Sequence, residues 1–139
     1  MYKSGWEGDL FYALDINPYV LTWGYEAITI IYTNPLLGKP TVYYPDIFIK
    51  VRQENGNEQS YLIEVKPAEE CVMPKVPIRR SSNSREDAMK YEKAMRRYKS
   101  ANREFLVNMA KWAAAQKWCL SHGVAWKLLN EKNTGSLFS

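Results

Sequence analysis

The chain contains one histidine, two cysteines and no long hydrophobic run. The single histidine, His122, argues against a Ser-His-Asp triad and against a zinc site, because both usually depend on imidazole. Cys71 and Cys119 are isolated and lack metal-ligand spacing, so a reduced intracellular compartment fits best. No stretch approaches the ~20 apolar residues of a membrane span, and the N-terminus lacks a signal-peptide pattern. We therefore expect no membrane partner.

Length and composition indicate one globular domain. The 139 residues are 46% apolar and 24% charged, which is enough to bury a core and ordinary for a protein of this class. We predict a single domain over residues 1–132, followed by a polar tail over residues 133–139.

The net charge of +4 is distributed unevenly. Between Lys75 and Glu104 lie ten Lys or Arg and four acids, a local charge of +6 that leaves −2 for the remainder. A concentrated basic segment suits binding of a polyanion. A solvated helix face would have the same composition, so the charges alone leave both interpretations open.

Residues 44–67 have the pattern of a β-hairpin. Two apolar runs, residues 42–51 and 60–65, flank a polar bend with Asn55-Gly56 at its centre. Asn-Gly favours a tight turn because both residues tolerate positive φ. We therefore predict two antiparallel strands over these runs.

Three charged residues interrupt the apolar runs of this hairpin: Asp46 near the start of the first strand, and Glu64 and Lys66 on the second. Glu64 and Lys66 project from one face of a strand, and antiparallel pairing can bring Asp46 beside them. Two converging carboxylates repel each other unless a cation lies between them, and Mg²⁺ or Mn²⁺ is the usual solution. With a lysine to hold a water, such a site suits phosphodiester hydrolysis. The alternative is a solvated Glu-Lys pair on a surface hairpin.

A helical pattern runs from Ser4 to Ile16 and stops at Asn17-Pro18. Its apolar stripe predicts a helix packed on the core. Ser4 and Glu7 have capping-box spacing, so Glu7 is a candidate for binding a free amide at the helix start.

The rest of the chain completes an α/β pattern, with a mixed sheet of about four or five strands flanked by helices. We expect strands at residues 19–26, 28–33 and 124–129, with loops at 34–40 and 68–84. A helix over residues 86–121 should break near residues 100–102, because unbroken it would be about 54 Å long. Gly123 and His122 have the positions of a helix C-terminal cap.

Pro45-Asp46 followed by Glu64-Val65-Lys66 resembles the PD-(D/E)xK nuclease superfamily. The whole chain is similar to the phage head-completion nucleases and to the endonuclease subunit of a Tn7-type transposase. The motifs that carry this similarity are Trp6-Glu7, LTWGYE at 21–26, YPD at 44–46, IEVKP at 63–67, NMAKWAAAQ at 108–116 and HGVAWKLL at 122–129.

The resemblance implies a restriction-endonuclease-like core and a Mg²⁺-dependent DNA endonuclease that acts late in virion assembly, at a DNA-filled head. The implied location is the host cytoplasm during assembly and the virion itself. The implied partners are double-stranded DNA and phage head, portal or other head-completion proteins, with the chain a monomer or homodimer. Because only five residues precede Trp6, we expect no counterpart of an N-terminal arm that other members carry.

The resemblance also assigns the site. Glu7, Asp46, Glu64 and Lys66 form the catalytic set, in which Lys66 orients the attacking water. Asp46, Glu64, Glu7 and the Val65 carbonyl would bind one or two Mg²⁺, with Mn²⁺ able to substitute. Lys111 and Gln116 are weaker candidates that face the site from the long helix, Gln116 as an outer support. The residues expected to contact DNA are Arg79, Arg80, Arg85, Lys93, Arg96, Arg97, Lys99 and Lys111.

Two further functions remain open from the sequence. One is a structural head-completion protein that binds the DNA end, with weak or vestigial nuclease activity. The other is a nuclease for branched DNA junctions, which would use the same residues on a different substrate.

Overall fold

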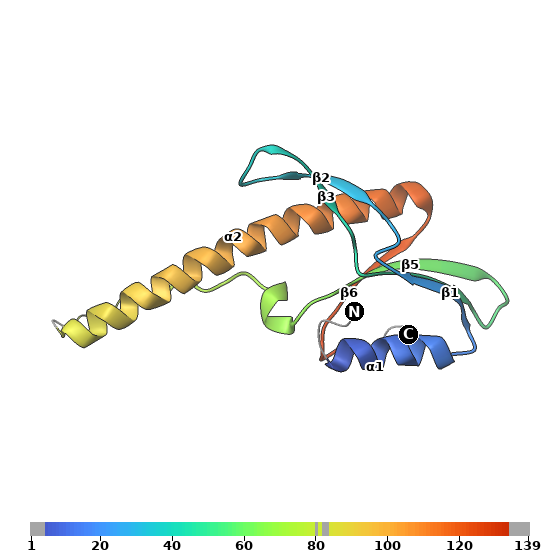
Figure 1. Cartoon of the computed structure of the whole chain (residues 1–139), viewed down its shortest axis with the longest axis horizontal. Helices are drawn as coiled ribbons and strands as arrows, with labels where there is room; N and C mark the ends of the chain where they lie inside the picture. Colours follow the sequence, from blue (N-terminus) through green and yellow to red (C-terminus); the bar gives the residue numbers. More distant parts are fainter. Residues whose placement is uncertain (1–4, 80, 82–83, 134–139) are drawn as a thin grey trace.

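A four-stranded mixed sheet carries the fold, with a long helix projecting from it (Figure 1). The computed structural model describes residues 5–79, 81 and 84–133. In chain order the elements are α1 Gly5–Ile16, β1 Val20–Tyr25, β2 Ile30–Asn34, β3 Lys39–Tyr43, β4 Ile47–Arg52, β5 Glu58–Val65, the 3₁₀ turn η1 Ala68–Cys71, α2 Arg85–His122 and β6 Ala125–Leu129. This α/β architecture is consistent with the predicted restriction-endonuclease-like fold.

The strand order in the main sheet is β1-β4-β5-β6. The predicted central hairpin is confirmed as β4 and β5, which pair antiparallel from Ile47 opposite Ile63 to Arg52 opposite Glu58. Gly56 in its turn has φ 85°, the positive angle that made Asn-Gly a turn signal. β6 then pairs parallel with β5, so both strands end at the same edge of the sheet.

The two faces of the main sheet are covered by different elements. The face formed by Ile47, Ile49 and Ile63 packs against α1, through Leu10 and Leu14 among others. On the other face, Leu62 packs with Trp112 and further residues of α2 and with buried side chains of β2 and β3. The alternation of side chains along β4 and β5 therefore decides which residues face which helix.

The β2–β3 hairpin corrects two predictions. Residues 42–51 do not form one strand, because Tyr43 ends β3 and Ile47 begins β4 in another sheet. Between them Pro45 has no N–H to continue a ladder. The loop predicted over residues 34–40 is a tight turn over residues 35–38, because β2 ends at Asn34 and β3 begins at Lys39. The Asn34 side chain accepts hydrogen bonds from the amides of Leu36 and Leu37 at 2.9 and 3.2 Å.

Helix α2 corrects a third prediction, because it runs unbroken for 38 residues with no interruption near residues 100–102. The Ser84 hydroxyl accepts from the Asp87 amide at its start, and Gly123, at φ 66°, ends it as predicted. Its buried residues all lie between Asn108 and Cys119. The preceding part, residues 85–104, projects beyond the sheet and is called the arm below (Figure 1). The arm contains no Gly or Pro, so nothing in its sequence stops a helix.

Candidate active site

Two buried carboxylates meet at one edge of the main sheet. Asp46 directly precedes β4, Glu64 lies on β5, and their side chains are only 2% and 4% exposed. The two strands pair with Ile47 opposite Ile63, so each carboxylate lies next to the first residue pair of the ladder. The predicted convergence of Asp46 and Glu64 is therefore present in the structure.

Asp46 is fixed through both its side chain and its backbone. Its Oδ2 accepts a hydrogen bond from the Val65 amide at 2.8 Å, and its carbonyl accepts from the Glu26 amide, also at 2.8 Å. Glu26 has φ 52°, a left-handed conformation that a non-glycine residue adopts at some cost. These bonds hold the carboxylate in place before any ligand is bound.

The pair is electrostatically strained. The pKa of Glu64 is raised to about 8, first by burial and then by the charge of Asp46 and a hydrogen bond between the two side chains, while Tyr43 and Lys66 act in the opposite direction. Near neutral pH the Glu64 carboxyl therefore holds a proton for much of the time. The two buried carboxyl groups cannot both carry a negative charge easily unless a cation lies between them. Their oxygens are ligands of the kind that a hard divalent cation prefers.

The described part of the chain supplies two carboxylates to this site and no more. Within it, no group of three or more His, Cys, Asp or Glu side chains is placed to hold a metal ion. The predicted third acid, Glu7, lies in α1, but its side chain is outside the described residues. Water and phosphate oxygens commonly complete the coordination of Mg²⁺, so two carboxylates fit such an ion. The roles of Glu7 and of the Val65 carbonyl stay predictions.

Lys66 follows β5 directly and is half-buried. Its amide donates to the Leu129 carbonyl at 2.9 Å, which ties the end of β5 to β6. Its positive charge lowers the pKa of Glu64, so its ammonium lies within electrostatic range of that carboxylate. The role of Lys66 in orienting the attacking water stays a prediction.

Tyr43 is a site residue that sequence reasoning missed. Its hydroxyl donates a hydrogen bond to Glu64 Oε2, inside the protein. Burial, and then the charge of Glu64, raise the pKa of Tyr43 above its ordinary value, so it remains a neutral donor. In the sequence, the one indication that Tyr43 belongs to the site is its position three residues before Asp46. That position does not predict that β3 folds over β5.

The two candidates on α2 differ in placement. The Lys111 ammonium lies 5.5 Å from the Tyr43 ring centroid and 5.9 Å from that of Tyr32. Lys111 therefore borders the site through Tyr43. Gln116 is exposed, and no hydrogen bond joins it to the carboxylates in the described part of the chain. Its supporting role stays a prediction.

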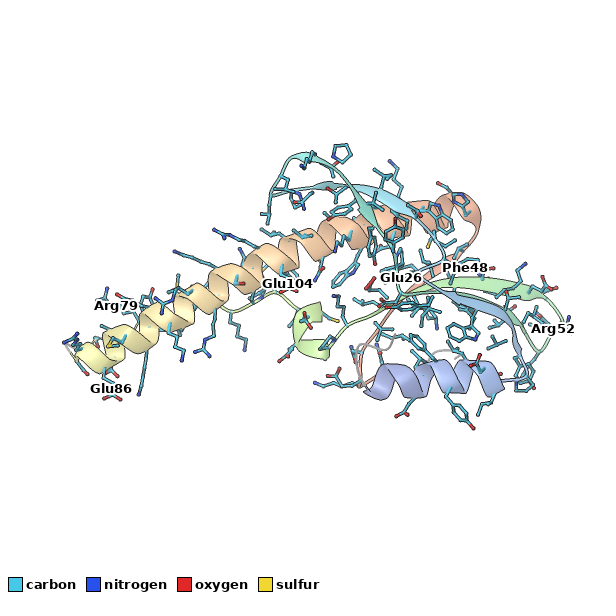
Figure 2. All side chains as sticks on the ribbon, in the orientation of Figure 1. Glu26, Phe48, Arg52, Arg79, Glu86 and Glu104 are labelled. Atoms are coloured by element: carbon cyan, nitrogen blue, oxygen red, sulfur yellow. The ribbon has the colours of Figure 1, made fainter. Side chains whose placement is uncertain are left out.

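The predicted DNA contacts lie mostly on the arm. Arg85, Lys93, Arg96, Arg97 and Lys99 are exposed along it. Arg79 lies over the ring of Tyr91, 5.8 Å from its centroid, and Figure 2 shows it far from the sheet, near Glu86. Arg80 is outside the described residues. The structure thus places a row of cations on a helix whose C-terminal half packs on the sheet and whose N-terminal half extends away from it.

Comparison with known proteins decides the family. The TnsA-like endonuclease N-terminal family matches residues 17–131, most of the chain. The protein belongs to this family. A head completion nuclease of Enterobacteria phage T4 is 30% identical over 136 residues, which cover 98% of this chain and 81% of that protein. No solved structure matches the chain.

Membership of the TnsA-like endonuclease N-terminal family confirms the resemblance inferred from the sequence motifs. The matched span contains Asp46, Glu64 and Lys66, whereas Glu7 precedes it. Among the described residues no helix is both long and apolar enough to cross a membrane.

Proposed function

We propose that this protein is a Mg²⁺-dependent DNA endonuclease that hydrolyses phosphodiester bonds of packaged DNA during phage head completion. The observation that carries the proposal is the buried Asp46–Glu64 pair, with Lys66 in electrostatic range of it. The endonuclease family and the similarity to a head completion nuclease support it. Mn²⁺ is expected to replace Mg²⁺ because both prefer oxygen ligands.

Each residue of the site has a distinct task in this proposal. Asp46 and Glu64 would hold the cation, with the Val65 carbonyl and Glu7 as further ligands. When bound, the cation stabilises negative charge on the phosphate oxygens. Lys66 holds the attacking water and stabilises the charge that develops as the P–O bond to the leaving oxygen breaks.

The arm would hold the DNA backbone beside this site. Its exposed cations suit contacts to phosphate, which supply affinity without reading sequence. The setting is the host cytoplasm during assembly and then the virion, with head, portal or other head-completion proteins as partners and the chain a monomer or homodimer. The similarity to the head completion nuclease of phage T4 supports this setting.

The test is a cleavage assay on plasmid, linear and branched DNA with Mg²⁺, Mn²⁺ or EDTA. We expect cleavage with either cation, none with EDTA, and none by Asp46→Asn. Asparagine keeps an oxygen that can accept from the Val65 amide, so this variant should fold. A plain Asp46→Ala change would instead leave that buried amide without its acceptor.

The matched control is Glu54→Gln, which makes the same change at an exposed position in the β4–β5 turn. It should cut at the wild-type rate. Wild-type protein that binds DNA but cuts none with any cation would favour a structural head-completion role. Preference for branched over linear DNA would indicate a junction nuclease, and full activity of Asp46→Asn would place the site elsewhere.

A further inference from the structure

We propose that Tyr43 is a positioning residue for the Glu64 carboxylate, and that it sets the affinity of the site for its cation. This inference rests on the proposed function and deepens it. The observation behind it is the hydrogen bond from the Tyr43 hydroxyl to Glu64 Oε2, made between two sheets that share no strand. Tyr43 lies on β3, outside the sheet that carries both carboxylates.

The bond involves Oε2 of Glu64, whose carboxyl also shares a hydrogen bond with the Asp46 side chain. Both partners are almost inaccessible to solvent, at 6% exposure for Tyr43 and 4% for Glu64. In such a place water cannot substitute for the hydroxyl, and without it the Glu64 carboxyl loses one of the contacts that fix its orientation. Donors of this kind orient a metal-binding carboxylate and tune its affinity without touching the metal.

The direction of the hydroxyl is itself fixed by packing. The Tyr43 ring meets the Tyr32 ring at 6.3 Å and an interplanar angle of 82°, an edge-to-face contact. The Lys111 ammonium on α2 lies 5.5 Å from the Tyr43 centroid. The β2–β3 hairpin and α2 together therefore hold the donor that orients Glu64.

Packing alone does not account for a tyrosine here. A phenylalanine would fill the same volume and keep both ring contacts without burying a hydroxyl. The hydroxyl is the part of the side chain that reaches the carboxylate, so its contribution should appear at the cation site.

The experiment compares Tyr43→Phe with Tyr32→Phe. Tyr32 is a matched control because it is 5% exposed and shares the ring contact and Lys111, while its hydroxyl makes no hydrogen bond within the described part of the chain. Mn²⁺ affinity is measured without DNA by electron paramagnetic resonance, and cleavage is measured against Mg²⁺ concentration.

For Tyr43→Phe we expect Mn²⁺ affinity to fall about tenfold or more, and the half-saturating Mg²⁺ concentration to rise by a similar factor. The cleavage rate at saturating Mg²⁺ should stay within about threefold of wild type, because the cation restores the geometry once bound. Tyr32→Phe should leave the cation dependence unchanged.

Equal cation affinities for the two variants would overturn the inference. A lower cleavage rate of Tyr43→Phe with unchanged cation affinity would overturn it as well. So would equal losses of cation affinity in Tyr43→Phe and Tyr32→Phe that are accompanied by lower thermal stability of both. If wild type binds Mn²⁺ but cuts no DNA, the proposed function fails, while the Mn²⁺ affinity of Tyr43→Phe still decides this inference. A wild type without measurable Mn²⁺ affinity overturns both.

Discussion

The carboxyl of Glu64 connects the candidate site to the stability of the fold. Its pKa is about 8 in the folded protein, against an ordinary value of 4.5. Between these two values the folded state retains a proton that the unfolded state has released. Raising the pH through this window therefore favours unfolding, because the unfolded state binds fewer protons there.

We predict that the metal-free protein loses stability as pH rises from about 5 to about 8. The loss should be on the order of a few kcal/mol in the free energy of unfolding, since one pKa unit corresponds to ~1.4 kcal/mol. Urea denaturation across this range, with EDTA present, measures it. Glu64→Gln should flatten the profile, whereas Glu54→Gln, exposed in the turn, should not. A Glu64→Gln profile as steep as that of wild type would contradict the prediction.

Lys66 should contribute to chemistry more than to DNA binding. Its ammonium is in electrostatic range of Glu64, and the charges that it would stabilise develop mainly in the transition state. Lys66→Met keeps most of the apolar stem. We predict a single-turnover rate lowered about 10²-fold or more, with DNA affinity changed by less than about threefold, under ~1 kcal/mol.

The matched control is Lys39→Met, at the exposed start of β3, which should leave the rate unchanged. Filter binding and single-turnover cleavage separate the two quantities. If Lys66→Met bound DNA much more weakly but cleaved it at the normal rate at saturating protein, Lys66 would contribute to binding the DNA phosphates and not to the chemical step.

Among the elements, the hairpin of β4 and β5 shows what local sequence determines. Asn55-Gly56 and the alternating apolar residues were sufficient to predict the hairpin and the approach of Asp46 to Glu64, although the first strand begins at Ile47 and not at residue 42. The contact of Tyr43 with Glu64 was not predictable in this way. It depends on how the separate β2–β3 hairpin folds over β5, a long-range arrangement that no pattern near Tyr43 encodes.

Helix α2 shows a limit of another kind. The expected break near residues 100–102 came from the size of the domain, not from any residue that would end a helix. The helix in fact continues past the core, about 57 Å at 1.5 Å per residue for its 38 residues. None of the buried residues of α2 lies in the arm, which is held by its own helical propensity, by the Ser84 cap and by contacts with the preceding segment, such as Arg79 over the Tyr91 ring.

This difference along α2 predicts uneven hydrogen exchange. Amides in residues 86–100 should exchange at least about tenfold faster than those in residues 108–120, because only the second group carries the buried residues of the helix. Residue-resolved exchange by NMR measures both groups in one sample, each serving as reference for the other. Uniform protection along α2 would show that the arm is buried against something in solution, such as a second copy of the chain.

Across the molecule as a whole, the concentrated positive charge and the buried carboxylates lie on different elements. Residues 75–104 carry +6 and the remainder −2, so the arm is basic while the buried carboxylates lie at the sheet edge. In Figure 2, Arg79 and Glu86 lie at the end of the arm, whereas Glu26, whose amide binds the Asp46 carbonyl, lies near the middle of the molecule. DNA would therefore be held by phosphate contacts along the arm, because the acidic pair does not itself attract a polyanion.

This arrangement predicts that the arm governs the salt dependence of DNA binding. Replacing Arg96, Arg97 and Lys99 by Gln removes three exposed charges and keeps good helix formers. The slope of log K against log salt should become shallower by up to roughly 2.7, at about 0.9 for each phosphate that the variant no longer neutralises. Affinity should fall by a similar factor on DNAs of unrelated sequence, because binding to phosphate carries no sequence information.

The control for the arm variant removes the same charge elsewhere, through Gln at Lys39, Arg52 and Lys132, all exposed and outside the arm. If net charge alone attracted DNA, both triple variants would flatten the slope equally. We expect the arm variant to flatten it and the control to leave it nearly unchanged, because counterions are released only where cations sit against phosphates. Fluorescence anisotropy across a range of salt concentrations would measure both slopes. Equal flattening in the two variants would show that DNA does not bind along the arm.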